Sequence, residues 1–242
     1  MFLLECLPRS GYKEIMKLLY SKVIKQVILM VLSVALCSCS SSGTARKLSD
    51  APEDLEKIHR ALDYPSYAVA LEKWKSINDV ADWMRQYFSY DLSRALELSE
   101  TNRRDIKKVA VYSPAELYLK KKGVCIDLAR FGVETVRKIF PESHPKYVMI
   151  EFTPIIIKGK TIRKHWIASY QKEGKYYYFA DSKRPGYIAG PYHDTEEFIN
   201  QYERYRGREI VSFKELDDFK KKRRFKKKKK YGVRDVHSFI SS

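Results

Sequence analysis

Cysteine is scarce in this sequence. Only four of the 242 residues are cysteines, and Cys125 is the only one that follows residue 40. A framework of disulfide bonds is therefore excluded for most of the chain, because this thiol has no partner there. The sequence also has no internal repeat, no glycine-rich phosphate-binding loop and no cysteine and histidine spacing that suits zinc. We therefore expect no cofactor and no metal.

Negative charge is also in short supply, and the net charge is +17. The excess is uneven, because most of it lies in the run KKKRRFKKKKK at residues 220–230 and part of it lies before Cys39. The middle of the chain is only mildly basic, so the charge is not a signature of a nucleic-acid-binding fold. The apolar content of 44%, with many tyrosines and phenylalanines, predicts a real core with substantial strand content.

The apolar run near the N-terminus is short. It covers residues 27–36, which is too few to span a bilayer comfortably. A short apolar run behind basic residues is typical of a secretory signal. The basic residues that precede this one are Lys17, Lys22 and Lys25.

The sequence Leu-Cys-Ser-Cys at residues 36–39 follows this run, and a serine-rich stretch comes next. It resembles the lipobox of bacterial lipoproteins, which implies cleavage before Cys39 and lipidation of Cys39. Cys37, in the middle of the motif, departs from the usual pattern. An uncleaved anchor helix is the alternative. Cys125 would then be the only free thiol of an exported protein.

These features divide the chain. We expect residues 1–39 to be a lipoprotein signal, with Met16 as the true start, and residues 40–50 to be a tether. Residues 51–213 should form one folded domain, and residues 214–242 a basic tail.

Capping signals and apolar periodicity predict five helices. They are Ala51–Leu62 with Asp50 as its cap, Ser76–Phe88, Ser113 to Gly123, Cys125 to just before Pro141, and Asp194–Tyr205. The polar residues 90–109 give no prediction.

Between residues 147 and 213 the pattern is typical of strands. The expected strands are Tyr147–Ile157, Ile162–Gln171, Lys175–Ser182 and Glu209–Phe213. Helices followed by adjacent strands predict an α+β fold.

The hairpin around residues 172–174 carries a candidate site. A three-residue turn that ends in Gly174 would place His165 directly opposite Asp181 on the same face. A carboxylate there would orient the imidazole. A shift of one residue would pair His165 with Ser182 and send Asp181 to the far face, so the inference depends on the turn.

Cys125 is the candidate nucleophile. A helix N-terminus stabilises a thiolate, and a neighbouring histidine would complete a thiolate–imidazolium pair. A lone cysteine in an apolar helix is more often an inert core residue, so the case depends on His165 and Asp181. Asp127 is expected to cap the helix or form a salt bridge, pointing away from the sulfur.

The three segments that carry these residues are GVCIDLARF, KHWIASY and YYYFADSKRPG. Together they resemble the core of the transglutaminase-like superfamily. The sequence WMRQYFSYD at residues 83–91 also resembles that family's upstream helix. The resemblance implies a papain-like α+β core with Cys125 as nucleophile, His165 as general base and Asp181 as the residue that orients it.

The oxyanion hole is less defined by the sequence. The Cys125 backbone N–H is one expected donor, because it lies at the helix start. A side chain upstream would be the second, with Tyr112 and Tyr118 as candidates. Trp166 is expected in the core or in a cleft wall.

The expected activity is that of a cysteine hydrolase of the peptidase or amidase type. It would act on a protein or peptide substrate through a thioester, and transglutaminase-type acyl transfer is the variant. The competing class is a non-catalytic binding or scaffold lipoprotein with the same fold.

The expected location is the cell envelope, with the protein held in the bacterial membrane by lipidated Cys39. The basic tail is either a solvated segment or a surface for anionic lipid or another acidic envelope polymer. Export argues against nucleic acid as its partner.

Overall fold

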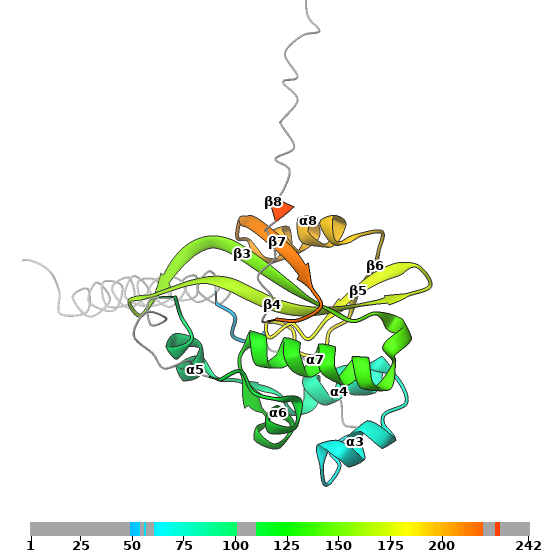
Figure 1. Ribbon diagram of the computed structural model, residues 1–242. Helices are drawn as coiled ribbons and strands as arrows, with labels where there is room; N and C mark the ends of the chain where they lie inside the picture. The colour runs from blue at the N-terminus through cyan, green and yellow to red at the C-terminus, as the bar shows by residue number, and fades with distance from the viewer. Residues whose placement is uncertain (1–48, 54–55, 57–60, 101–109, 220–225, 228–242) are drawn as a thin grey trace, which may run out of the picture. The chain divides into compact units, whose positions relative to one another are not determined.

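The computed structural model describes residues 49–53, 56, 61–100 and 110–219, together with the backbone of the short strand at 226–227. All of them belong to a compact unit that begins at Arg46. Its main element is a six-stranded sheet with helices on both faces (Figure 1). Within this described part, no helix combines the length and the apolar character needed to cross a membrane.

The longest described helix is α7, which carries Cys125. The described helices are α3 (Tyr67–Lys73), α4 (Ile77–Tyr87), α5 (Leu92–Glu97), α6 (Pro114–Lys120), α7 (Cys125–Ile139), the 3₁₀ turn η2 (Pro141–Ser143) and α8 (Thr195–Arg206).

The six-stranded sheet is antiparallel, and its strand order is β6-β5-β4-β3-β7-β8. Strands β1 and β2 form a separate parallel pair, and β2 directly precedes α7 in the sequence. The strands are β1 (Ser89–Tyr90), β2 (Lys122–Gly123), β3 (Lys146–Ile157), β4 (Lys160–Lys172), β5 (Lys175–Phe179), β6 (Ala189–Tyr192), β7 (Ile210–Leu216) and β8 (Lys226–Lys227). This arrangement confirms the α+β prediction of a helix-borne cysteine packed on an antiparallel sheet.

The helices form two layers around the sheet. In Figure 1, α7 lies against one face together with α4, α6 and α3, and α8 covers the opposite face. The layer under α7 has an aromatic centre, in which the Trp83 ring stacks on Tyr118 at 4.9 Å and on Phe131 at 4.7 Å between centroids. Such ring pairs add about 0.5–1.5 kcal/mol each beyond the area they bury, so they fix α7 firmly.

Most of the predicted helix starts are confirmed. Ser76 and Ser113 each form the predicted capping box, and α7 begins at Cys125. The helix predicted to stop at Gly123 ends earlier, at Lys120. The reason is that Lys121 adopts a left-handed conformation with φ of 53°, after which β2 pairs with β1.

The predicted helix over residues 51–62 is wrong where it is described. Residues 51–53, 56 and 61–62 are not helical, and the others lie outside the described residues. Asp50 does not act as a helix cap, because Arg206 binds its carboxylate. Helix α3, capped by Ser66, was not predicted.

The strand predictions hold within a few residues. Strand β7 continues to Leu216, past the boundary expected at residue 213, and β8 lies within the segment expected to be a tail. Of the residues expected to be signal and tether, 1–48 lie outside the described residues.

The predicted register of the β4–β5 hairpin is wrong by one residue. The turn contains only Glu173 and Gly174, which both have positive φ (52° and 72°), and Lys172 pairs with Lys175. Such a two-residue turn matches the twist of the flanking strands better than the predicted three-residue turn. A regular continuation of this register would direct Asp181 away from His165.

The chain departs from this regular register at Ala180. Strand β5 ends at Phe179, and Ala180 has a left-handed φ of 57°, which turns the next residue out of the strand's alternation. Gly132 of α7 makes room for this turn, because a Cβ at Gly132 would lie 2.8 Å from the Ala180 Cβ. A glycine on one element thus allows the turn that brings Asp181 to His165.

Candidate active site

Cys125 is the first residue of α7 and is 8% exposed. The buried Asp127 carboxylate fixes this helix start, because it accepts hydrogen bonds from the backbone N–H of Val124 (3.1 Å) and of Tyr112 (2.8 Å). Arg94 donates two further hydrogen bonds to the Asp127 carboxylate, of 2.7 and 3.0 Å. The predicted capping role of Asp127 is therefore confirmed.

His165 lies on β4 and is fully buried. Its Nε2 lies 2.9 Å from Asp181 Oδ1, which is a hydrogen bond. Its Nδ1 has no hydrogen-bond partner among the described residues. The structure therefore brings together the three residues that the sequence singled out: Asp181 fixes one imidazole nitrogen, and an imidazole nitrogen lies within 4.8 Å of the Cys125 sulfur.

Asp181 is held from several sides. Its Oδ1 also accepts a hydrogen bond from the Lys183 backbone N–H at 2.9 Å, and its Oδ2 accepts one from the Tyr202 hydroxyl at 3.0 Å. Burial raises the pKa of Asp181, but the hydrogen bond and charge of His165, with the charge of Arg206, outweigh it and lower this pKa to about 2.

Tyr202 and Arg206 of α8 support the site from the opposite layer. The Tyr202 ring stacks on the His165 ring, with 6.1 Å between centroids and 19° between planes. The buried Arg206 donates to the Tyr202 hydroxyl at 2.9 Å. Sequence reasoning missed both residues, because nothing in the pattern of α8 distinguishes them from other buried positions.

Asp50 is the unexpected member of the site. The sequence indicated only a helix cap or the end of the tether, but its Oδ1 lies 3.3 Å from His165 Nδ1 and 2.6 Å from Arg206 Nη2. Burial raises the pKa of Asp50, but the positive charges of His165 and Arg206 outweigh this and hold the pKa well below its ordinary value. No local sequence signal could have found this contact, because 115 residues separate Asp50 from His165.

The two carboxylates act on His165 together. Burial alone would lower the pKa of His165. The negative charge of Asp50 and the hydrogen bond to Asp181 outweigh burial and hold this pKa well above 6.5. The imidazole lies between the two carboxylates, with Nε2 2.9 Å from Asp181 Oδ1 and Nδ1 3.3 Å from Asp50 Oδ1.

Donor atoms of Asp50, Cys125 and His165 all lie within 4.8 Å of one another. A thiolate, an imidazole and a carboxylate are ligands that zinc accepts, so these three could hold a metal ion. The prediction of no metal rested on sequence spacing, and that criterion does not detect residues so far apart. Arg206 already pairs with the Asp50 oxygen, so a cation would compete with it.

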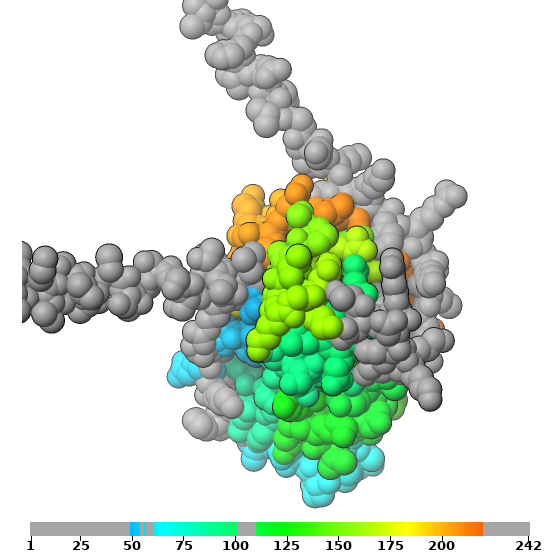
Figure 2. Space-filling view, turned by 90° about the vertical axis from the view of Figure 1, so that its left-hand side faces the viewer, coloured from blue at the N-terminus to red at the C-terminus, as the bar shows by residue number. Residues whose placement is uncertain are grey.

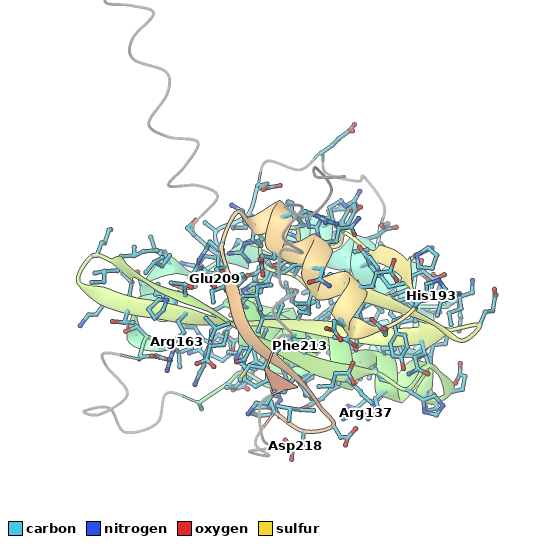
Figure 3. The ribbon with its side chains drawn as sticks, turned by 90° about the horizontal axis from the view of Figure 1, so that it is seen from above. Arg137, Arg163, His193, Glu209, Phe213 and Asp218 are labelled. Carbon is cyan, nitrogen blue, oxygen red and sulfur yellow. The ribbon has the colours of Figure 1, made fainter. Side chains whose placement is uncertain are left out.

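A cleft opens beside Cys125. Its lining includes Tyr90 of β1 and Trp166, which confirms the prediction for Trp166. The end of α5 forms one wall, through Ala95, Leu98, Ser99 and Glu100, and β4 forms the other, through Thr161, Ile162, Arg163 and Lys164. In Figure 3, Arg163 lies toward the left end of the sheet, and His193, which does not line the cleft, lies toward the right end.

The two tyrosines proposed for the oxyanion hole are elsewhere. The Tyr118 hydroxyl donates to the Tyr64 carbonyl at 2.9 Å, and the Tyr112 ring lies under the Arg94 guanidinium at 3.7 Å. Neither lines the cleft in the described part of the chain. The prediction of these residues as donors is therefore wrong, because both side chains serve the packing around α6 and α7.

The comparisons agree with this geometry. A model of the transglutaminase-like domain matches residues 56–210, which is more than half of the chain. This protein therefore belongs to the transglutaminase-like family. A search of the curated proteins finds no match. The fold, the family and the meeting of Cys125, His165 and an aspartate fit a cysteine-type hydrolase.

The low pKa of Asp181 should affect how the free energy of unfolding changes at acid pH. A carboxyl whose pKa is about 2 in the folded state and 3.8 in the unfolded state stabilises the fold above pH 4. This stabilisation, about 2 kcal/mol, is lost as pH falls from 5 to 2. Urea unfolding of wild type and Asp181→Asn across this range should show a shallower loss in the variant. Parallel curves would contradict this assignment.

Proposed function

We propose that this protein is a lipid-anchored cysteine hydrolase of the bacterial cell envelope. It would cleave amide bonds in proteins or peptides through Cys125, His165 and Asp181. The observation that carries the proposal is the state of His165. Its Nε2 is bound to Asp181 at 2.9 Å, and an imidazole nitrogen lies within 4.8 Å of the Cys125 sulfur.

The reaction follows from these positions. The Cys125 thiol gives its proton to His165 Nδ1, and the sulfur attacks the carbonyl carbon of the substrate. The C–N bond breaks, and His165 returns the proton to the departing amine, which leaves a thioester on Cys125. Water then adds to the thioester and gives a proton to His165. The C–S bond breaks, and the thiol recovers its proton.

Asp181 and Tyr202 are positioning residues in this scheme. Asp181 fixes the ring so that Nδ1, and not Nε2, faces the sulfur, and it stabilises the imidazolium that forms. Burial raises the pKa of Tyr202 well above its ordinary value. Its hydroxyl therefore stays protonated and donates to Asp181 rather than competing for His165.

Tyr90 is the second oxyanion donor that we propose, beside the Cys125 backbone N–H. It lines the cleft with Cys125, and it pairs with Gly123, two residues before the nucleophile. Burial raises the pKa of Tyr90 well above 10, and the neighbouring Asp50 and Cys125 raise it further. The phenol therefore stays protonated, as a donor must.

Hydrolysis is preferred over transfer to a lysine amine, because water is always present and the two carboxylates among the described lining residues, Asp50 and Glu100, already pair with arginines. The lipid anchor rests on the sequence around Cys39. The basic residues at 220–230 would lie against anionic headgroups of the same membrane.

The test is the rate of Cys125 alkylation by iodoacetamide against pH in the full-length protein. Tryptic cleavage isolates Cys125 in the peptide of residues 123–130, so mass spectrometry separates it from the other cysteines. We expect the reaction to persist well below pH 8.5, the ordinary pKa of a free thiol. His165→Ala should remove this acid-side reactivity, and His193→Ala, which alters an exposed histidine, should not.

A rate that follows an ordinary thiol in the wild type, in His165→Ala and in variants of Asp50 would sink the hydrolase proposal. It would favour the non-catalytic binding or scaffold protein instead.

A further inference from the structure

Residues 49–53, which we call the strap, lie against the site. The Ser49 carbonyl accepts a hydrogen bond from Arg206 at 3.3 Å, and the Asp50 carbonyl accepts one from the Ser182 hydroxyl at 3.3 Å. The Glu53 backbone N–H donates to the Lys183 carbonyl at 3.0 Å. In Figure 2 the strap appears as a blue patch beside the yellow-green hairpin of β3 and β4.

The strap places one side chain in the site. The Asp50 carboxylate is held by Arg206 at 2.6 Å, lies 3.3 Å from His165 Nδ1 and is within 4.8 Å of the Cys125 sulfur. Asp50 also lines the cleft. A substrate that approached Cys125 along this cleft would therefore meet the strap.

This position opposes the chemistry of the site in two ways. The negative charge of Asp50 repels a thiolate on Cys125. The same carboxylate lies 3.3 Å from His165 Nδ1, so it occupies the position beside the nitrogen that must exchange a proton with the sulfur.

We propose that the strap is an autoinhibitory segment, which must leave His165 and the cleft before Cys125 can react with a substrate. The inference rests on the proposed function of the same site. The described contacts that hold the strap include those of the Asp50 carboxylate with Arg206 and His165, and hydrogen bonds of Ser49, Asp50 and Glu53. The strap also directly follows residues 1–48, where the sequence predicts the tether and the lipid anchor.

The experiment compares four full-length proteins in detergent micelles: wild type, Asp50→Ala, Asp50→Asn and Glu53→Ala. Glu53 is the matched control, because it removes the same charge from the same strap without contacting His165. Asp50→Asn keeps the size of the side chain and an oxygen that can accept from Arg206. It covers the case in which Asp50→Ala fails to fold, which a thermal melt by circular dichroism would reveal.

The readout is the rate of iodoacetamide alkylation of the peptide of residues 123–130 at pH 7. We expect Asp50→Ala and Asp50→Asn to react about tenfold faster than wild type, since loss of the charge favours the thiolate and frees His165 Nδ1. Glu53→Ala should stay near the wild-type rate.

The outcomes separate the two proposals. Equal rates in all four proteins, with a slower rate in His165→Ala, would contradict the autoinhibitory role of the strap. They would not contradict the proposed hydrolase function. Slower alkylation in both Asp50 variants would also contradict the autoinhibitory role, because Asp50 would then assist the thiolate. Ordinary thiol behaviour in every variant would overturn both proposals.

Discussion

Replacing Tyr90 by phenylalanine is expected to slow the acylation of Cys125 by about 100-fold, which is the usual loss when one oxyanion donor is removed. The phenol lines the cleft beside Cys125, on a strand that pairs with Gly123. When the sulfur attacks a carbonyl, the oxygen becomes an oxyanion, and a protonated phenol stabilises it more than it stabilises the ground state.

The measurement uses two reagents that differ in this one respect. The ester p-nitrophenyl acetate acylates the sulfur through an oxyanion and releases p-nitrophenolate. Iodoacetamide alkylates the sulfur by displacing iodide, and no oxyanion forms. Tyr90→Phe should therefore lose acylation and keep alkylation at the wild-type rate.

The control is Tyr112→Phe, because Tyr112 was a candidate from the sequence and its ring lies under Arg94. It should change neither rate. Equal losses of acylation and alkylation in Tyr90→Phe would assign Tyr90 to the packing of the site instead of the oxyanion hole.

The second large effect concerns stability. Replacing Asp127 by alanine is expected to lower the free energy of unfolding by about 3–5 kcal/mol, the usual cost of breaking a buried ion pair from one side. The Asp127 side chain is fully buried and that of Arg94 is 8% exposed. The variant would leave Arg94 without its ion-pair partner, and the backbone N–H groups of Val124 and Tyr112 without their acceptor.

Glu116→Ala is the matched control for this variant. Glu116 occupies the same third position of its helix and bonds back to Ser113, but it is exposed. Urea unfolding should show a far smaller loss for Glu116→Ala. Similar losses in both variants would mean that Asp127 acts only as an ordinary helix cap.

Local signals were read correctly from the sequence because they depend on neighbouring residues. The capping boxes at Ser76 and Ser113 satisfy N–H groups within the same helix turn, and their spacing is visible in the chain. The start of α7 at Cys125 is predicted in the same way. Runs rich in β-branched and aromatic residues gave β3, β4 and β7, since these side chains favour extended backbone.

The pairing of His165 with Asp181 was predicted for a reason that the structure does not support. The turn is one residue shorter than expected, and regular pairing would have separated the two side chains. Ala180 restores the contact through a left-handed conformation, for which Gly132 of α7 leaves space. Neither feature is visible locally, because alanine rarely adopts this conformation without tertiary support.

The sequence alone determined the α+β class, the helix that begins at the candidate nucleophile and the residue types of the site, since these follow from short-range pattern and chemistry. Only the tertiary structure decided which side chains surround His165. Asp50, Tyr202 and Arg206 reach it from the strap and from α8, and their contacts depend on a buried network of charges that forms once the layers pack. Burial gives those charges their strength, and burial is a property of the whole fold.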